Sequence, residues 1–228
     1  MFENYIEREN TIFEILQSFI DARLDYIVVG GYAISAYKHR FSVDADIVLK
    51  SEDKSKFEEI LKKKGLAKTV VKDLNHLYAP EFIRYELKTK LPISIDLLID
   101  GIGSRTTAAS FSFEQLKEHS RKKKIIGTEK EVIAQVPQRE VLIVLKLHSG
   151  RLTDFRDIAT LAKNIDIGII ESMIWQGKIE IVKENIKKLI SLLDKKEFMD
   201  SFKGVFMEKK YDIDSDEIKK LNRLLKNG

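Results

Sequence analysis

The sequence has no cysteine among its 228 residues and only three prolines. The absence of cysteine excludes disulfides, cysteine-ligated zinc and thiol catalysis together. No stretch approaches the ~20 consecutive apolar residues of a membrane-spanning helix, and the N-terminus, MFENYIEREN, is too charged for a signal peptide. We therefore expect a cytoplasmic protein with no membrane partner.

An excess of charge of one sign is also lacking. Forty basic residues against 36 acidic ones leave a formal net charge of +4, so the overall charge does not indicate a nucleic-acid-binding protein. A hydrophobic content of 43% is typical of a folded chain, with one generous domain or a core domain and a smaller appendage. The four histidines, His39, His76, His119 and His148, are dispersed without metal-ligand spacing.

The most informative stretch spans residues 26–50 and begins with a short apolar strand. Its pattern predicts a strand over 26–29, a tight turn at Gly30 and Gly31, and a short helix over 32–39. Glycines lack a Cβ atom and let a phosphate approach the backbone, while the following helix offers free N–H groups. The glycine pair therefore indicates a phosphate site.

A second strand, predicted over 41–49, carries two aspartates. Side chains alternate along a strand, so Asp44 and Asp46 share one face with Ser42. Two carboxylates side by side are costly unless a cation neutralises them, and Mg²⁺ prefers such oxygen ligands. The sequence therefore predicts a metal beside the phosphate. The opposite face of this strand carries Val43, Ala45 and Ile47.

A third acid, Asp96, interrupts an apolar strand predicted over 93–99. A lone carboxylate in a buried strand is costly without a partner, and a neighbouring metal would be that partner. Asp100 is the alternative, but it lies at the end of the strand before Gly101, where aspartate more often forms a turn. We therefore prefer Asp96 as the third metal ligand.

These motifs resemble the signature of the DNA polymerase beta-like nucleotidyltransferase superfamily. The match is closest to its small prokaryotic AbiEii-type toxin and minimal nucleotidyltransferases. The signature is a glycine pair, about a dozen residues, and then Arg-x-Ser-x-Asp-x-Asp before an apolar strand. The resemblance implies catalytic and metal-binding roles for Asp44, Asp46 and Asp96, and nucleotide-binding roles for Gly30, Gly31, Arg40 and Ser42. Many members have serine where this chain has Gly31, and Ser35 is a nearby substitute for its hydroxyl.

The resemblance reaches roughly residue 164 and includes a lysine and an aspartate beyond the strands. Lys146 and Asp157 match helical positions at which the family binds nucleotide. The structural alternative is that Lys146 extends to the surface while Arg156 pairs with Asp157 or Asp154. We carry both interpretations forward.

The implied fold is α/β (α+β), with a mixed-sheet nucleotidyltransferase core over residues 1–136 and a C-terminal helical region over 137–228. Periodicity predicts the remaining strands over 66–71 and 82–87 and a hairpin around Gly127, with a loop over 101–110. Helices are predicted over 3–24, 51–64, 111–119 and 138–149, from a cap at Thr153 onward, and over 169–175, 179–193, 198–206 and 213–225.

The implied activity is transfer of a nucleoside monophosphate from a nucleoside triphosphate to an acceptor hydroxyl on RNA, protein or a small molecule. Two Mg²⁺ ions, with Mn²⁺ as an alternative, would serve as cofactors. A toxin–antitoxin system with a cognate protein partner is one setting. An inactive binding module of the same fold is the alternative function. A nucleic-acid-binding protein that uses lysine-rich helices is a third, but it leaves the acidic strands unexplained.

Overall fold

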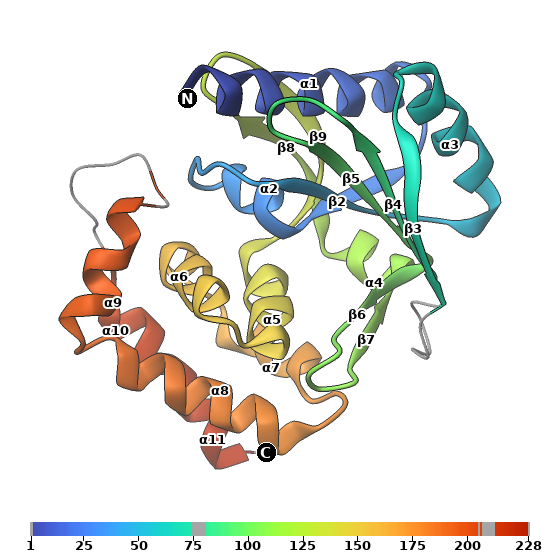
Figure 1. The fold of residues 1–228 in the computed structure, drawn as a ribbon. Helices are drawn as coiled ribbons and strands as arrows, with labels where there is room; N and C mark the ends of the chain where they lie inside the picture. The colour runs from blue at the N-terminus through green and yellow to red at the C-terminus, as the bar shows by residue number, and fades with distance from the viewer. Residues whose placement is uncertain (1, 74–80, 205, 207–212, 228) are drawn as a thin grey trace. The chain divides into compact units, whose positions relative to one another are not determined.

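The computed structural model describes residues 2–73, 81–204, 206 and 213–227 (Figure 1). The chain divides into two compact units. The first comprises Met1–Ile102 and Phe111–Pro137, and the second comprises Gly103–Ser110 and Gln138–Gly228. Within the described residues, no helix is long and apolar enough to cross a membrane.

The described part of the first unit is built on a seven-stranded sheet with the order β3-β4-β5-β2-β1-β9-β8. β2 runs parallel to β5 and β1 parallel to β9, while the other neighbours are antiparallel. The sheet is therefore mixed, as the sequence predicts. Its strands are β1 (Tyr26–Val29), β2 (Asp44–Leu49), β3 (Ala67–Asp73), β4 (Glu81–Leu87), β5 (Ile93–Ile99), β8 (Ser120–Ile126) and β9 (Glu131–Pro137).

Two helices, α1 (Phe2–Asp21) and α3 (Lys54–Lys63), pack on one face of this sheet (Figure 1). Their contact with β1 is aromatic: the ring of Phe19 on α1 lies 4.8 Å from that of Phe57 on α3 and 5.7 Å from that of Tyr26 on β1. The apolar side of the amphipathic α1 is thereby buried. The unit also contains two shorter helices, α2 (Gly30–Ser35) and α4 (Phe113–Glu118), and a 3-10 segment at Ser51–Asp53.

The second unit is helical, apart from its share of the short strands β6 (Gly101–Gly103) and β7 (Ser110–Ser112). α5 (Arg139–Ser149) lies at its centre and contacts α6, α7 and α8. Gly150 ends α5 with a φ of +69°, a left-handed conformation that glycine adopts without strain. The other helices are α6 (Leu152–Leu161), α7 (Ile167–Ile174), α8 (Ile179–Leu192), α9 (Lys196–Asp200), α10 (Ser215–Lys219) and α11 (Leu224–Asn227), with 3-10 segments at Ser201–Gly204 and Lys220–Arg223.

The expected fold class is confirmed, but several element boundaries differ. The strand expected over 41–49 begins at Asp44, and Val43, which the alternation placed on the same face as the buried Ala45 and Ile47, is 61% exposed. Pairing explains this difference, because β2 pairs with β5 only from Asp44 onward and an unpaired segment need not alternate. The helix expected over 32–39 begins at Gly30, so the glycines form its first turn.

Further differences lie around the second unit. The loop expected over 101–110 contains β6 and leads into β7. α6 begins at Leu152 after Arg151, so Thr153 lies inside the helix instead of capping it. Of the helix expected over 198–206, residue 205 lies outside the described residues.

Candidate functional site

Three acidic side chains lie on one face of the neighbouring parallel strands β2 and β5. The strand register aligns Asp46 with Asp96, and Asp44 with Ser94. Residues paired across adjacent strands point to the same face, so Asp44, Asp46 and Asp96 project together. Asp46 also pairs with Val29, three residues after Tyr26, and the acidic face is therefore opposite the one that α1 and α3 cover.

An arginine from β4 binds two of these acids. The antiparallel pairing of β4 with β5 places Arg84 beside Asp96. Its Nε donates to Oδ1 of Asp96 at 2.7 Å, and its Nη2 donates to Oδ2 of Asp96 at 2.6 Å and to Oδ2 of Asp44 at 2.9 Å. Arg84 is not among the site residues predicted from the sequence. The available signal is a charged residue in the middle of a predicted strand, as Asp96 is in the next strand.

The charges in this cluster depend on one another. Burial raises the pKa of Asp96, although the hydrogen bonds and charge of Arg84 act in the opposite direction. The hydrogen bond to Asp96 in turn raises the pKa of Arg84. The partner expected for Asp96 was a metal, whereas the partner in this structure is the guanidinium. Arg84 therefore supplies the positive charge that the buried carboxylate needs.

The donor chemistry at this cluster fits a hard cation. Two carboxylate oxygens from different strands already converge on Nη2 of Arg84, and Asp46 lies in the same register row. Mg²⁺ favours such oxygens at ~2.0–2.1 Å, so the carboxylates would have to move closer together than they are around a guanidinium. In the described residues, no three acidic or histidine side chains lie close enough together to hold a metal ion.

The two glycines bring the start of α2 into contact with the acidic strand. A Cβ atom at Gly30 would lie 2.0 Å from Oδ2 of Asp46, and one at Gly31 would lie 2.2 Å from Oγ of Ser42 and 2.8 Å from Nη2 of Arg40. Gly30 also has a φ of +62°. The structure therefore gathers these five sequence-predicted residues at one place, and only glycine fits at both positions.

The hydroxyl at this turn belongs to Ser42. Ser35, the expected substitute for the missing serine, is only 1% exposed, and its hydroxyl donates to the carbonyl oxygen of Arg40 at 2.9 Å. Ser35 therefore holds the segment after α2 in place. Oγ of Ser42 instead lies where a side chain at position 31 would begin.

Asp100, the alternative third acid, has a turn-forming role. Its Oδ1 accepts a hydrogen bond from the backbone N–H of Ser51 at 2.7 Å, and its φ is +60°. Aspartate tolerates this left-handed conformation better than most residues. The geometry therefore agrees with the reason for which Asp96 was preferred.

A hollow of about 350 Å³ on the first unit lies away from the acids, along α1 and the turn between β8 and β9. Half of its lining residues are glutamates and only one is basic, so it is unsuited to the negatively charged phosphates of a nucleotide. The lining residues are Glu3, Ile6, Glu7, Asn10, Thr11, Glu14, Glu129 and Lys130.

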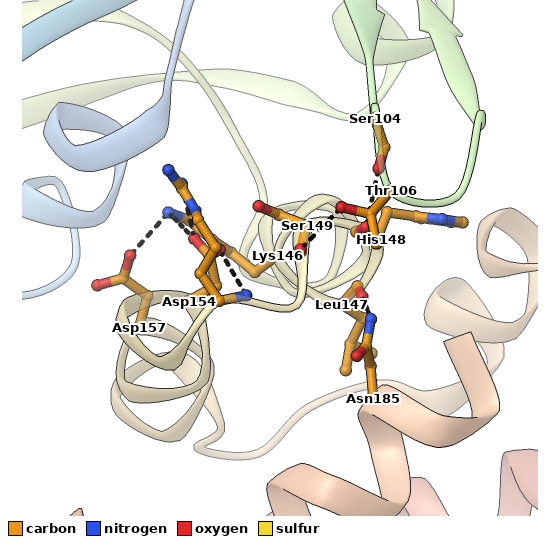
Figure 2. A network of polar contacts seen from close by, with 10 residues as sticks. Ser104, Thr106, Lys146, Leu147, His148, Ser149, Asp154, Asp157 and Asn185 are labelled. Atoms are coloured by element: carbon orange, nitrogen blue, oxygen red, sulfur yellow. Dashed lines mark hydrogen bonds and ion pairs between the residues drawn. The ribbon is translucent and has the colours of Figure 1, made fainter. Parts of the chain in front are cut away.

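Lys146 and Asp157 belong to the second unit, where they form a buried ion cluster (Figure 2). Nζ of Lys146 on α5 lies 2.7 Å from Oδ2 of Asp157 and 3.0 Å from Oδ1 of Asp154, both on α6. The two aspartates are fully buried and Lys146 is 8% exposed. The alternative in which Lys146 extends to the surface is therefore wrong. Arg156 donates to the carbonyl oxygen of Ser201.

Asp154 is the member of this cluster whose role the sequence did not show. Burial alone would raise its pKa, but the hydrogen bonds from Arg151 and the charge of Lys146 outweigh burial and hold the pKa of Asp154 at about 2. Its Oδ2 accepts from both the backbone N–H and Nε of Arg151. This carboxylate therefore joins the start of α6 to α5.

No protein-family model matches the sequence, and no curated protein matches it. Among solved structures, JHP933 from Helicobacter pylori is similar, with a TM-score of 0.50 and 16% identity over 99% of this chain and 91% of that chain. ANT(2'')-Ia in complex with adenylyl-2''-tobramycin has a TM-score of 0.49 and 13% identity over 76% of this chain and 95% of that chain. The lincomycin-bound lincosamide antibiotic adenylyltransferase LnuA has a TM-score of 0.46 and 19% identity over 69% of this chain and 98% of that chain. At these identities the similarity to JHP933 shows a shared fold.

Proposed function

We propose that this chain is a metal-dependent nucleotidyltransferase of the DNA polymerase beta-like superfamily. It would move a nucleoside monophosphate from a nucleoside triphosphate to an acceptor hydroxyl. One observation carries the proposal: Asp44, Asp46 and Asp96 project from one face of adjacent parallel strands, and the backbone of Gly30 lies against Asp46. A carboxylate cluster beside a glycine turn at the start of a helix suits a metal-bound triphosphate.

The three aspartates would hold two Mg²⁺ ions, or Mn²⁺ in their place. When bound, such ions neutralise phosphate charge and lower the pKa of the attacking hydroxyl. The chain's own residues bind and orient the substrate. Gly30 and Gly31 would let the backbone N–H groups of the first turn of α2 bind phosphate oxygens, and the hydroxyl of Ser42 lies beside Gly31.

Lys146 and Asp157 have a structural role in this proposal. The lysine charge is already balanced by Asp154 and Asp157, which favours a cluster that joins α5 to α6 over a direct phosphate contact. The nucleotide-binding role that the resemblance implies for both residues stays a prediction. We also propose residues 1–136 as the catalytic core and 137–228 as a separate C-terminal helical region.

The test is transfer of label from each of the four ribonucleoside triphosphates in the presence of Mg²⁺. Transfer RNA, total cell protein and the protein alone serve in turn as acceptors. We compare the wild type with Asp46→Asn and with the control Asp73→Asn, which makes the same change at an exposed position on β3. We expect the rate of label transfer by Asp46→Asn to fall about 100-fold or more, and Asp73→Asn to keep full activity. An active Asp46→Asn variant would reject the assignment.

A second outcome would favour the alternative function. Absence of transfer, together with absence of Mg²⁺-dependent nucleotide affinity, would indicate an inactive module that acts through a protein partner. The AbiEii-type assignment and the toxin–antitoxin setting predict that such a partner binds this chain. Co-purification of the tagged protein from its own cells tests for that partner.

A further inference from the structure

Arg84 lies where two of the proposed metal ligands converge. A single nitrogen, Nη2, is 2.6 Å from Oδ2 of Asp96 and 2.9 Å from Oδ2 of Asp44. These two oxygens come from different strands, and a cation that bridges them must approach the same pair of atoms. The guanidinium thus takes the position of a positive charge that the site is built to receive.

We propose that Arg84 is an internal competitor of the divalent cation. In the metal-free protein its guanidinium neutralises Asp44 and Asp96 and holds them together, and metal binding displaces Nη2 from between them. This inference rests on the proposed function, because it concerns the same three aspartates.

Coulomb repulsion and ligand geometry favour displacement over coexistence. An ion ~2.1 Å from Oδ2 of Asp96 would lie no more than about 5 Å from Nη2, which is itself 2.6 Å from that oxygen. Two positive charges at this separation repel, and both would lie between the same two carboxylate oxygens. Either the ion or Nη2 therefore occupies the space between the two carboxylates.

The exposure of the side chains indicates which group moves. The side chain of Arg84 is 31% exposed, whereas that of Asp96 is 4% exposed. The arginine can therefore rotate toward solvent, whereas the buried Asp96 has little room for more than a small adjustment. Nε of Arg84 also donates to Oδ1 of Asp96, and this hydrogen bond alone would suffice to orient the Asp96 carboxylate. The additional contact of Nη2 with Asp44 therefore serves charge neutralisation across the two strands.

The first experiment measures Mn²⁺ binding without nucleotide, from the electron paramagnetic resonance signal of free Mn²⁺. The proteins are the wild type, Arg84→Gln and Arg121→Gln. Arg121 is the control because it lies on β8, at the far side of the same sheet, and donates to the backbone carbonyl groups of Glu118 and Ser120. We expect Arg84→Gln to bind Mn²⁺ at least about tenfold more tightly than the wild type does. Arg121→Gln should bind Mn²⁺ with the affinity of the wild type.

The second experiment uses the wild-type protein, so it does not depend on the folding of a variant. Phenylglyoxal modifies accessible guanidinium groups, and peptide mass spectrometry locates the modified residues. We expect Mn²⁺ to increase modification of Arg84 severalfold and to leave Arg121 unchanged, because displacement exposes the Arg84 guanidinium to the reagent.

The outcomes separate this inference from the function on which it rests. If the wild type binds Mn²⁺ while Arg84→Gln binds it equally or more weakly, and Mn²⁺ does not expose Arg84 to phenylglyoxal, Arg84 is not a competitor. The proposed metal site would then survive. If neither protein binds Mn²⁺ at millimolar concentration, the metal dependence and this inference are both rejected.

Discussion

A Cβ atom at Gly30 would lie 2.0 Å from Oδ2 of Asp46, so the first residue of α2 and the second acid of β2 are in direct contact. Real Cβ atoms do not approach other atoms this closely. The contact explains why residue 30 is glycine, because a larger residue would collide with Asp46. It holds Asp46 against the backbone at which a phosphate is proposed to bind.

The first prediction compares Gly30→Ala with Gly65→Ala. Both glycines have positive φ, +62° and +83°, but the nearest atom to a Cβ at Gly65 is Cδ1 of Leu87 at 3.6 Å, an ordinary contact. Gly65→Ala should therefore lower the free energy of unfolding by about 1–2 kcal/mol through backbone strain alone. Gly30→Ala should lower the free energy of unfolding, measured by urea denaturation, by more than Gly65→Ala does. It should also abolish nucleotidyl transfer, because Asp46 must move. Equal losses in both variants would contradict this.

The second prediction concerns the hydroxyl beside Gly31. Gly31→Ser should be destabilising, because its Cβ would lie 2.2 Å from Oγ and 2.8 Å from Cβ of Ser42. Ser42→Gly removes both atoms, so the double variant should recover part of the lost stability, with a coupling energy of about 1–3 kcal/mol in a double-mutant cycle. Partial recovery of nucleotide affinity would show that a hydroxyl at either position serves the phosphate. Additive losses would show that the two sites are independent.

The acidic site could be predicted from sequence because its signals are local. Alternation along β2 places Asp44 and Asp46 on one face, and Asp96 interrupts an apolar run within a single strand. Each inference needs only the period of a strand. The same local rule failed at Val43, because that residue precedes the paired part of the strand and is exposed.

The charge partners could not be predicted, because they depend on contacts between separate elements. Arg84 reaches Asp96 only because β4 pairs with β5 in one particular register. Asp154 receives Lys146 through the packing of α6 against α5. Periodicity shows that each element exists, but neither a strand register nor a helix contact can be read from the segment alone.

The third prediction is a pH dependence that arises from His148. Nδ1 of this buried ring lies 2.8 Å from Oγ1 of Thr107, and burial lowers the pKa of His148 from 6.5 to about 4. Between these values the unfolded chain gains a proton that the folded chain does not, so stability falls as the pH falls from about 6.5 to 4, by up to roughly 3 kcal/mol. Urea denaturation at several pH values should show this loss.

The control for that prediction is His148→Asn, which cannot titrate in this range. Other groups titrate in both proteins, so the difference between the two stability curves isolates the histidine. We expect the variant to be less stable at pH 7 and to lose less stability on acidification to pH 4.5. Parallel curves would mean that the histidine gains its proton equally in both states.

The last prediction tests whether Lys146 holds the helices together. Lys146→Met leaves Asp154 and Asp157 buried without their shared cation, which should cost about 3–5 kcal/mol. Lys187→Met, the same change at an exposed position on α8, should cost less than about 0.5 kcal/mol.

A triple variant separates charge from packing in this cluster. Lys146→Met combined with Asp154→Asn and Asp157→Asn removes all three charges, so it should be more stable than Lys146→Met alone, because no uncompensated carboxylate stays buried. If Lys146→Met instead matches the wild type in stability but loses affinity for the metal–nucleotide complex, the lysine serves the phosphate. The ion cluster would then be the resting state of a substrate-binding residue.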